Sequence, residues 1–124
     1  MKKSVLLYNF DKNRLQLVRK ALSPLGCTVK TVLKKDYCHP IGYLVGAEGM
    51  LPGKQKYSGN GFDDEMLVMN GFGSEMIDVL IAALKNGGVG KVDLKAVITP
   101  SNINWDSITL YNAVKADHME MNRH

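Results

Sequence analysis

The chain has 124 residues, of which 45% are hydrophobic, and a formal net charge of +4. This length fits a single domain, residues 1–124, with a buried core, and the composition excludes an intrinsically disordered chain. No apolar run reaches the roughly 18 residues of a membrane span, and the N-terminus lacks the pattern of a secretory signal. We therefore expect a cytoplasmic protein without membrane association, in which Cys27 and Cys38 are free thiols.

The first half of the chain has the pattern of a strand, a helix and a second strand. Ser4–Asn9 is a short apolar run typical of a buried strand, and Asp11 is a suitable cap for a following helix. Pro24 ends that helix, and the β-branched segment Cys27–Leu33 predicts the second strand. The apolar positions of the helix recur at helical spacing: Leu15, Val18, Leu22 and Leu25.

A connector, residues 36–64, separates the two halves and is rich in glycine. Its composition argues against a long regular element, although Ile41–Val45 can form a turn of helix. A loop of this length is either a functional lid or a surface excursion, and the sequence leaves both open. Gly53-Lys54 does not complete a phosphate-binding P-loop, because Glu48 stands at the first glycine position and Gln55 follows the lysine.

The second half repeats the pattern. Glu65–Asn70 predicts a strand, Ser74 a helix N-cap, and Met76–Lys85 a helix that stops at a glycine pair. This helix is apolar nearly all round, so we expect part of it to form a homodimer contact unless the connector covers it. A weak similarity between the two strands, Leu6-Leu-Tyr-Asn and Leu67-Val-Met-Asn, suggests an internal repeat without establishing duplication.

The chain then ends in a strand and a helix. Val92–Thr99 predicts the strand, Pro100 marks its end, and Asn104 or Asp106 begins the helix. One stripe of that helix carries Ile108, Tyr111, Val114 and His118. On such a stripe, His118 is more often a half-buried, hydrogen-bonded side chain than a catalytic one.

These elements predict an α/β fold of the order βαβ-connector-βαβα. We expect four parallel or mostly parallel strands in the order 2-1-3-4, with helices on both faces. A ferredoxin-like antiparallel sheet is the alternative. Antiparallel pairing of Val5–Asn9 with Leu67–Asn70 would overturn the choice of the parallel arrangement.

Polar residues follow several of the predicted strands and suggest a ligand site. In a parallel sheet the strand ends meet at one edge, beside helix N-termini that bind anions. The residues expected there are Asn9, Asp11, Asn70, Ser74, Thr99, Asn102 and Trp105. The same residue types are ordinary turn and cap residues, and Trp105 equally suits a packing role that closes the turn onto the core.

The sequence contains no recognisable catalytic set. Asn9 and Asn70 stand where a phosphoacceptor receiver domain needs carboxylates, so phosphotransfer is not expected. The histidines are scattered, and Cys38-His39 is a poor spacing for one metal ion. We therefore expect no catalytic residues, no metal and no other cofactor.

The segment from Glu65 to Met121 resembles the bacterial family known as domain of unknown function 3783. The matching residues are Glu65-Met-Leu-Val, Leu80, Leu84, Leu94-Lys-Ala-Val-Ile-Thr99, Asn102, Trp105, Leu110 and His118. The family pattern usually has a glutamate before the histidine, where this chain has Asp117. The resemblance implies a small α/β domain and no known reaction, cofactor or partner.

Three classes of function are compatible with these observations. A non-enzymatic binding or assembly domain is favoured, since no concentrated catalytic set is present. An enzyme that binds a small polar or anionic molecule at the strand ends is the alternative. Nucleic-acid binding ranks third, because basic residues concentrate in the first half of the chain without interleaved aromatic residues.

Overall fold

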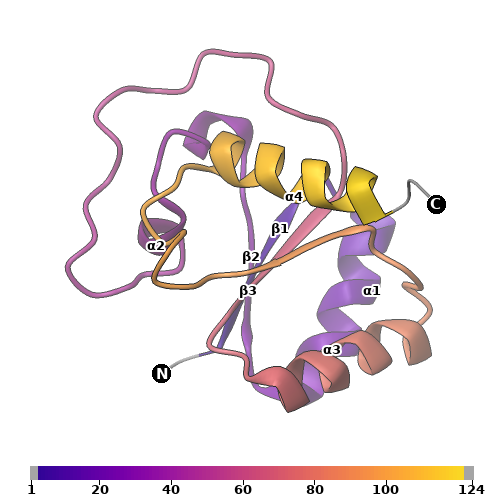
Figure 1. Cartoon of the computed structure of the whole chain (residues 1–124). Coiled ribbons are helices and arrows are strands. Elements are labelled where there is room, and N and C mark those ends of the chain that lie inside the picture. Colours follow the sequence, from indigo (N-terminus) through magenta and orange to yellow (C-terminus); the bar gives the residue numbers. More distant parts are fainter. Residues whose placement is uncertain (1–2, 122–124) are drawn as a thin grey trace.

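The computed structural model describes residues 3–121, which form one four-stranded sheet with helices on both faces (Figure 1). The main elements in chain order are β1 (Ser4–Tyr8), α1 (Lys12–Leu22), β2 (Thr28–Thr31), α2 (Ile41–Leu44), β3 (Met66–Asn70), α3 (Ser74–Asn86), β4 (Leu94–Val97) and α4 (Ser107–Met121). Short 3₁₀ turns lie at Ser23–Leu25 and Lys34–Asp36. The outer strands β2 and β4 are shorter than the apolar runs from which they were predicted.

The strand order is β2-β1-β3-β4. The predicted α/β class, the order 2-1-3-4 and the mostly parallel character are confirmed, since β1 pairs parallel with β2 and β3 pairs parallel with β4. The sheet is nevertheless mixed. Its central pair is antiparallel, with Ser4 opposite Asn70 and Tyr8 opposite Met66, so the expectation of a parallel pair at this position was wrong.

The connector explains the antiparallel central pair. A crossover within each βαβ unit fixes the direction of its two strands, but a long link between units does not fix how the units are oriented. Here the link leaves β2 and enters β3 at the same edge of the sheet, so it does not cross the sheet. The two βαβ units are therefore related by a rotation of about half a turn around an axis perpendicular to the sheet.

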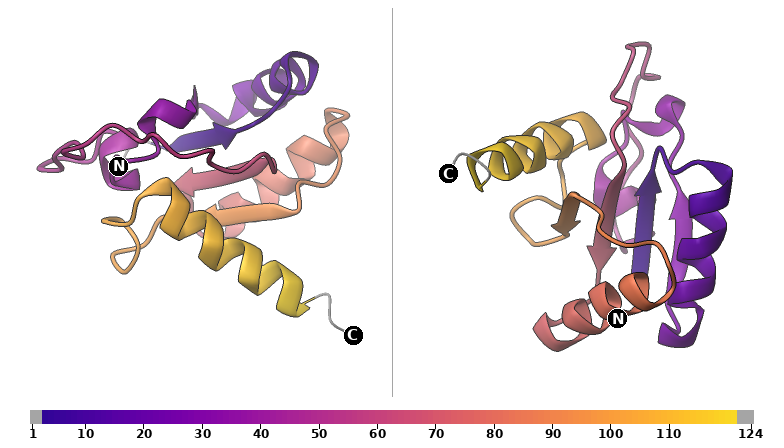
Figure 2. Two further views of the ribbon diagram at one scale, coloured as in Figure 1. Left: turned by 90° about the horizontal axis from the view of Figure 1, so that it is seen from above. Right: turned by 90° about the vertical axis from the view of Figure 1, so that its right-hand side faces the viewer.

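Alternating strand residues separate two layers of core. Helices α1 and α3 pack together on one face, over Val5, Leu7, Leu67 and Met69. Helix α4 and the connector cover the opposite face, where Tyr8 and Ser107 share a buried hydrogen bond of 2.7 Å. Figure 2 shows the two layers from further directions, with the orange strand β4 at one side of the sheet and the yellow helix α4 beside it.

Three helix starts were predicted from capping residues, and two are confirmed. Asp11 accepts a hydrogen bond from the Arg14 N–H at 2.8 Å, and Asp106 accepts one from the Thr109 N–H at 2.8 Å. At α3 the cap is Gly73, and Ser74 is the first helical residue, so the prediction of Ser74 as N-cap was wrong by one position. Helix ends shift by a residue easily, because the flanking backbone groups differ little in energy.

The connector is fixed near its start to the turn that precedes α4. The predicted turn of helix is α2, whose Ile41 N–H donates to the Trp105 carbonyl at 2.8 Å and whose Gly42 N–H donates to the Ile103 carbonyl at 3.0 Å. A Cβ at position 42 would lie 2.5 Å from Ile103 Cγ1, so this close approach requires glycine. The rest of the connector extends beyond α2, away from the sheet, before it returns to β3 (Figure 1).

Both cysteines are free thiols, as predicted, and the structure shows both to be half-buried. Within residues 3–121, no helix combines the length and the apolar character needed to cross a membrane.

Candidate functional site

The antiparallel central pair divides the predicted ligand site. Asn9 and Asp11 follow β1 at one edge of the sheet. Asn70 ends β3 at the opposite edge, and the residues that follow β3 and β4 belong to that edge as well. These residues are Ser74, Thr99, Asn102 and Trp105. A single site that gathers all seven residues is therefore not formed.

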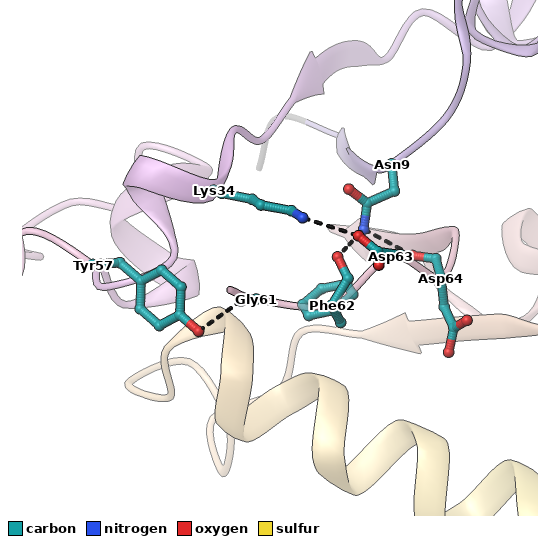
Figure 3. A network of polar contacts seen from close by, with 7 residues as sticks. All are labelled: Asn9, Lys34, Tyr57, Gly61, Phe62, Asp63 and Asp64. Atoms are coloured by element: carbon teal, nitrogen blue, oxygen red, sulfur yellow. Dashed lines mark hydrogen bonds and ion pairs between the residues drawn. The ribbon is translucent and has the colours of Figure 1, made fainter. Parts of the chain in front are cut away.

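At the first edge, the predicted residues hold the backbone in place. Asn9 has a left-handed backbone with φ of 64°, and its side-chain amide donates to the carbonyls of Phe62 at 2.7 Å and Asp64 at 3.0 Å (Figure 3). Asp11 caps α1. These contacts attach the end of the connector to the end of β1, which is a structural role.

Further polar contacts secure the same end of the connector. Lys34 donates to Asp63 at 2.9 Å, and the Gly61 N–H donates to the Tyr57 hydroxyl at 3.0 Å (Figure 3). The Asp64 carboxylate accepts bonds from Tyr111 at 2.6 Å and Lys115 at 2.9 Å. These two donors lower the pKa of Asp64, and the charged carboxylate in turn raises the pKa of Tyr111 to about 12.

Asn102 closes the turn at the opposite edge. Its side-chain oxygen accepts a bond from the Thr99 N–H at 2.8 Å, and its amide donates to the Val97 carbonyl at 3.0 Å. This is local capping of the kind expected for asparagine in a turn. The turn also positions Trp105, whose side chain is 36% exposed.

A groove of about 360 Å³ runs between β4 and α4, and we call it the β4 groove. One wall is β4 and the residue before it, the other is α4, and the predicted residues Asn102 and Trp105 close one end. The lining residues are Asp93, Lys95, Ala96, Val97, Asn102, Trp105, Leu110, Ala113, Val114, Asp117, His118 and Met121. Two of the seven predicted site residues therefore share one cavity, together with the Asp117-His118 pair.

The groove lies along an unpaired side of the sheet. Strand β4 pairs only with β3 and is therefore an edge strand, although its Val97 carbonyl already accepts a hydrogen bond from the Asn102 amide. A second cavity of about 310 Å³ adjoins β4 and is lined mainly by apolar atoms of α3 and the following loop, including Ile81, Leu84 and Val92. Lys95 lines both cavities.

Charge in the groove is mixed. Asp93 and Asp117 contribute carboxylates, and His118 is half-buried, as predicted. Burial lowers the pKa of Lys95, whose ammonium donates a hydrogen bond to the Val92 carbonyl. On α4 the groove is lined by apolar side chains, among them Leu110 and Val114, and also by the polar pair Asp117-His118, so the cavity presents both apolar and polar surface.

Sequence reasoning missed most of the groove. Asp93, Lys95 and the α4 wall residues Ala113 and Val114 were not singled out as site residues. One signal was available, because a lysine inside a short strand is a common way to protect a sheet edge. Lys95 occupies such a position in β4.

The comparison with protein families confirms the resemblance seen in the sequence. Residues 65–121 match the model of DUF3783, described as a domain of unknown function. The matched segment contains β3, α3, β4 and α4, and all the residues that line the β4 groove lie within it. No curated protein and no solved structure matches the chain.

Proposed function

We propose that the protein is a cytoplasmic binding or assembly domain that holds an extended peptide segment along the outer side of β4. The observation that carries this proposal is the pairing of an open strand edge with a cavity on each side. In strand addition, backbone hydrogen bonds to a sheet edge give affinity, and pockets for alternate side chains give specificity. The β4 groove and the α3-side cavity supply two such pockets.

The dimensions fit a short segment. An extended chain rises about 3.3 Å per residue, so the four residues of β4 can pair with a segment of similar length. Successive side chains of that segment would point to opposite faces of the sheet. One set would enter the β4 groove, near Trp105 and Val114, and the other would contact Ile81 and Val92.

A matched pair of substitutions on α4 tests the proposal. Ala113 lines the groove, whereas the neighbouring Asn112 is exposed and does not line it. We expect Ala113→Arg to weaken binding of a capped peptide of alternating valine and threonine, because the new side chain fills the site. The affinity should fall by at least roughly tenfold, which corresponds to about 1.4 kcal/mol of binding free energy. Asn112→Arg adds the same charge and should leave the affinity unchanged.

Binding is measured from the fluorescence of Trp105, the only tryptophan, and from amide shifts in NMR spectra. We expect the shifts to centre on residues 94–97. Shifts centred on β2, the other edge strand, or equal affinities for the two variants would contradict the proposal.

A second candidate is self-association through α3, which a separate observation favours. Val79 is 47% exposed and Ile81 is 42% exposed, and the connector packs on the opposite face of the sheet, so it does not cover them. Exposed apolar side chains beside an apolar cavity are typical of contact surfaces. A symmetric dimer through the side of α3 that carries Ile81 would bury this residue together with the adjoining cavity, whereas Val79 lies on the other side of the helix.

We expect sedimentation to show a dimer that Ile81→Glu disrupts without unfolding the domain, because this side chain already faces outward. Ala82→Glu, at an exposed neighbouring position, is the control and should retain the dimer. A monomer at high protein concentration would rule out this candidate and leave peptide binding at β4 unaffected.

A further inference from the structure

A cavity of about 310 Å³ within the connector lies outside the β4 groove and contains a thiol. It forms where the connector folds back on itself, so that residues 53–56 lie over residues 35–39. The side chains that matter for its chemistry are Lys35, Asp36, Cys38, His39, Lys54 and Lys56. These include a nucleophile, a base and three cations, and neither proposed function uses them.

The cavity is held together by specific contacts. The Gly53 N–H donates to His39 Nδ1 at 2.9 Å, and His39 Nε2 lies 3.5 Å from Asp36 Oδ1. A Cβ at position 53 would lie 2.3 Å from the Cys38 carbonyl oxygen, so only glycine allows the two segments to come this close. The Gly53-Lys54 pair, which fails as a P-loop, thus has a different role in closing this cavity.

Cys38 is partly accessible and lies in a cavity of net positive charge. Its side chain is half-buried, and its Sγ lies 3.7 Å from His39 Nδ1 and 3.8 Å from the Lys35 carbonyl oxygen. Three lysines and a single aspartate line the cavity, so its formal charge is positive even when His39 is neutral. An excess of positive charge in a cavity raises the local concentration of anionic molecules.

We propose that Cys38 is a modification site for small anionic disulfides, of which glutathione disulfide is the representative. The Cys38 thiol releases its proton to solvent, and the thiolate attacks one sulfur of the disulfide. A new S–S bond forms between Cys38 and that half of the molecule, the original S–S bond breaks, and the other half leaves as a thiolate. The lysines hold the carboxylates of the incoming molecule.

Cys27 provides an internal control. It is also half-buried, but burial raises the pKa of its thiol, and its Sγ donates to the Leu22 carbonyl at 3.9 Å. It packs against the α1 and α3 layer of the core, away from the lysine-lined cavity. Since the thiolate is the reactive form, Cys27 should react slowly.

The test compares two single-thiol variants, Cys27→Ser and Cys38→Ser, with two disulfide probes. Dithiobis(nitrobenzoate) is an anionic probe and dithiodipyridine is a neutral one. We expect the thiol of Cys38 to react with the anionic probe roughly tenfold faster than that of Cys27, with a rate that falls as salt increases. Incubation with glutathione disulfide should add one glutathione to Cys27→Ser and none to Cys38→Ser, as measured by intact mass.

Charge variants separate electrostatic recognition from simple exposure. In the Cys27→Ser background, replacing Lys54 and Lys56 by glutamine should slow the anionic probe several-fold and leave the neutral probe unchanged. Replacing the exposed Lys12 and Lys20 by glutamine makes the same change in net charge on α1 and should affect neither. Equal rates for the two cysteines, or a Cys38 rate that salt and the cavity lysines do not affect, would overturn the proposal.

Discussion

Replacing Phe62 by alanine is expected to lower the free energy of unfolding by about 3–5 kcal/mol, the usual effect of removing a large aromatic side chain from a core. Phe62 is 6% exposed and stacks on Tyr111, with ring centroids 3.9 Å apart and planes 4° from parallel. It also stacks on Tyr37 at 4.9 Å and contacts Tyr8 at 5.5 Å. One side chain therefore joins the connector, the sheet and α4.

Chemical denaturation measures the loss, and hydrogen exchange shows where it acts. We expect faster exchange in the connector and the start of α4 than in the layer of α1 and α3, which Phe62 does not touch. Leu51→Ala is the control within the same connector, since Leu51 is 76% exposed and should change stability by less than about 0.5 kcal/mol. Similar effects of the two substitutions would show that the aromatic cluster does not hold the connector in place.

Most of the fold follows from local patterns in the sequence. Short apolar runs alternate with helical periodicities, and this alternation is sufficient for the class, the strand order and the covering of both faces. The direction of β3 relative to β1 could not be predicted from the sequence, because both directions bury the same residues. The connector settles the direction through contacts such as those of Phe62, which a periodicity does not encode.

The similarity between the sequences of β1 and β3 also could not be interpreted correctly without the structure. The sequence similarity aligns Leu6 with Leu67. In the structure, however, Leu6 lies on the face covered by α4, and Leu67 lies on the face covered by α1 and α3. The pairing register relates Leu6 to Val68, which lies directly across from it and on the same face. A shift of one residue exchanges the faces of a strand, so a similarity read from the letters alone can be out of phase with the structure.

The site could not be predicted correctly for the same reason, since the direction of β3 relative to β1 was unknown. The residues following each strand were identified, but gathering them into one site required all the strands to point the same way. Asn102 and Trp105 line the same cavity because they belong to one βαβα unit, whose local connections fix their positions. The α4 wall was missed because Ala113 and Val114 have the apolar character of ordinary core residues, and only the structure shows them facing an open strand edge.

Replacing Asn9 by alanine is expected to lower the free energy of unfolding by about 2–4 kcal/mol, although the sequence gives Asn9 the appearance of a ligand-binding residue. Two effects add. The left-handed backbone, φ 64°, costs an ordinary L-residue about 1–2 kcal/mol, a cost that asparagine tolerates better than most. The two hydrogen bonds to the Phe62 and Asp64 carbonyls contribute about 1 kcal/mol each.

Asn9→Gly separates these effects, because glycine adopts the left-handed backbone freely but makes no side-chain hydrogen bonds. We expect it to be less destabilising than Asn9→Ala by about 1 kcal/mol, with the difference measuring the backbone cost. Asn70 occupies the end of β3, much as Asn9 follows β1, but the side chain of Asn70 does not hold the connector. Asn70→Ala should therefore lower the free energy of unfolding by less than Asn9→Ala. If glycine and alanine at position 9 were equally destabilising, the hydrogen bonds alone would account for the asparagine, and the left-handed backbone would carry no measurable cost.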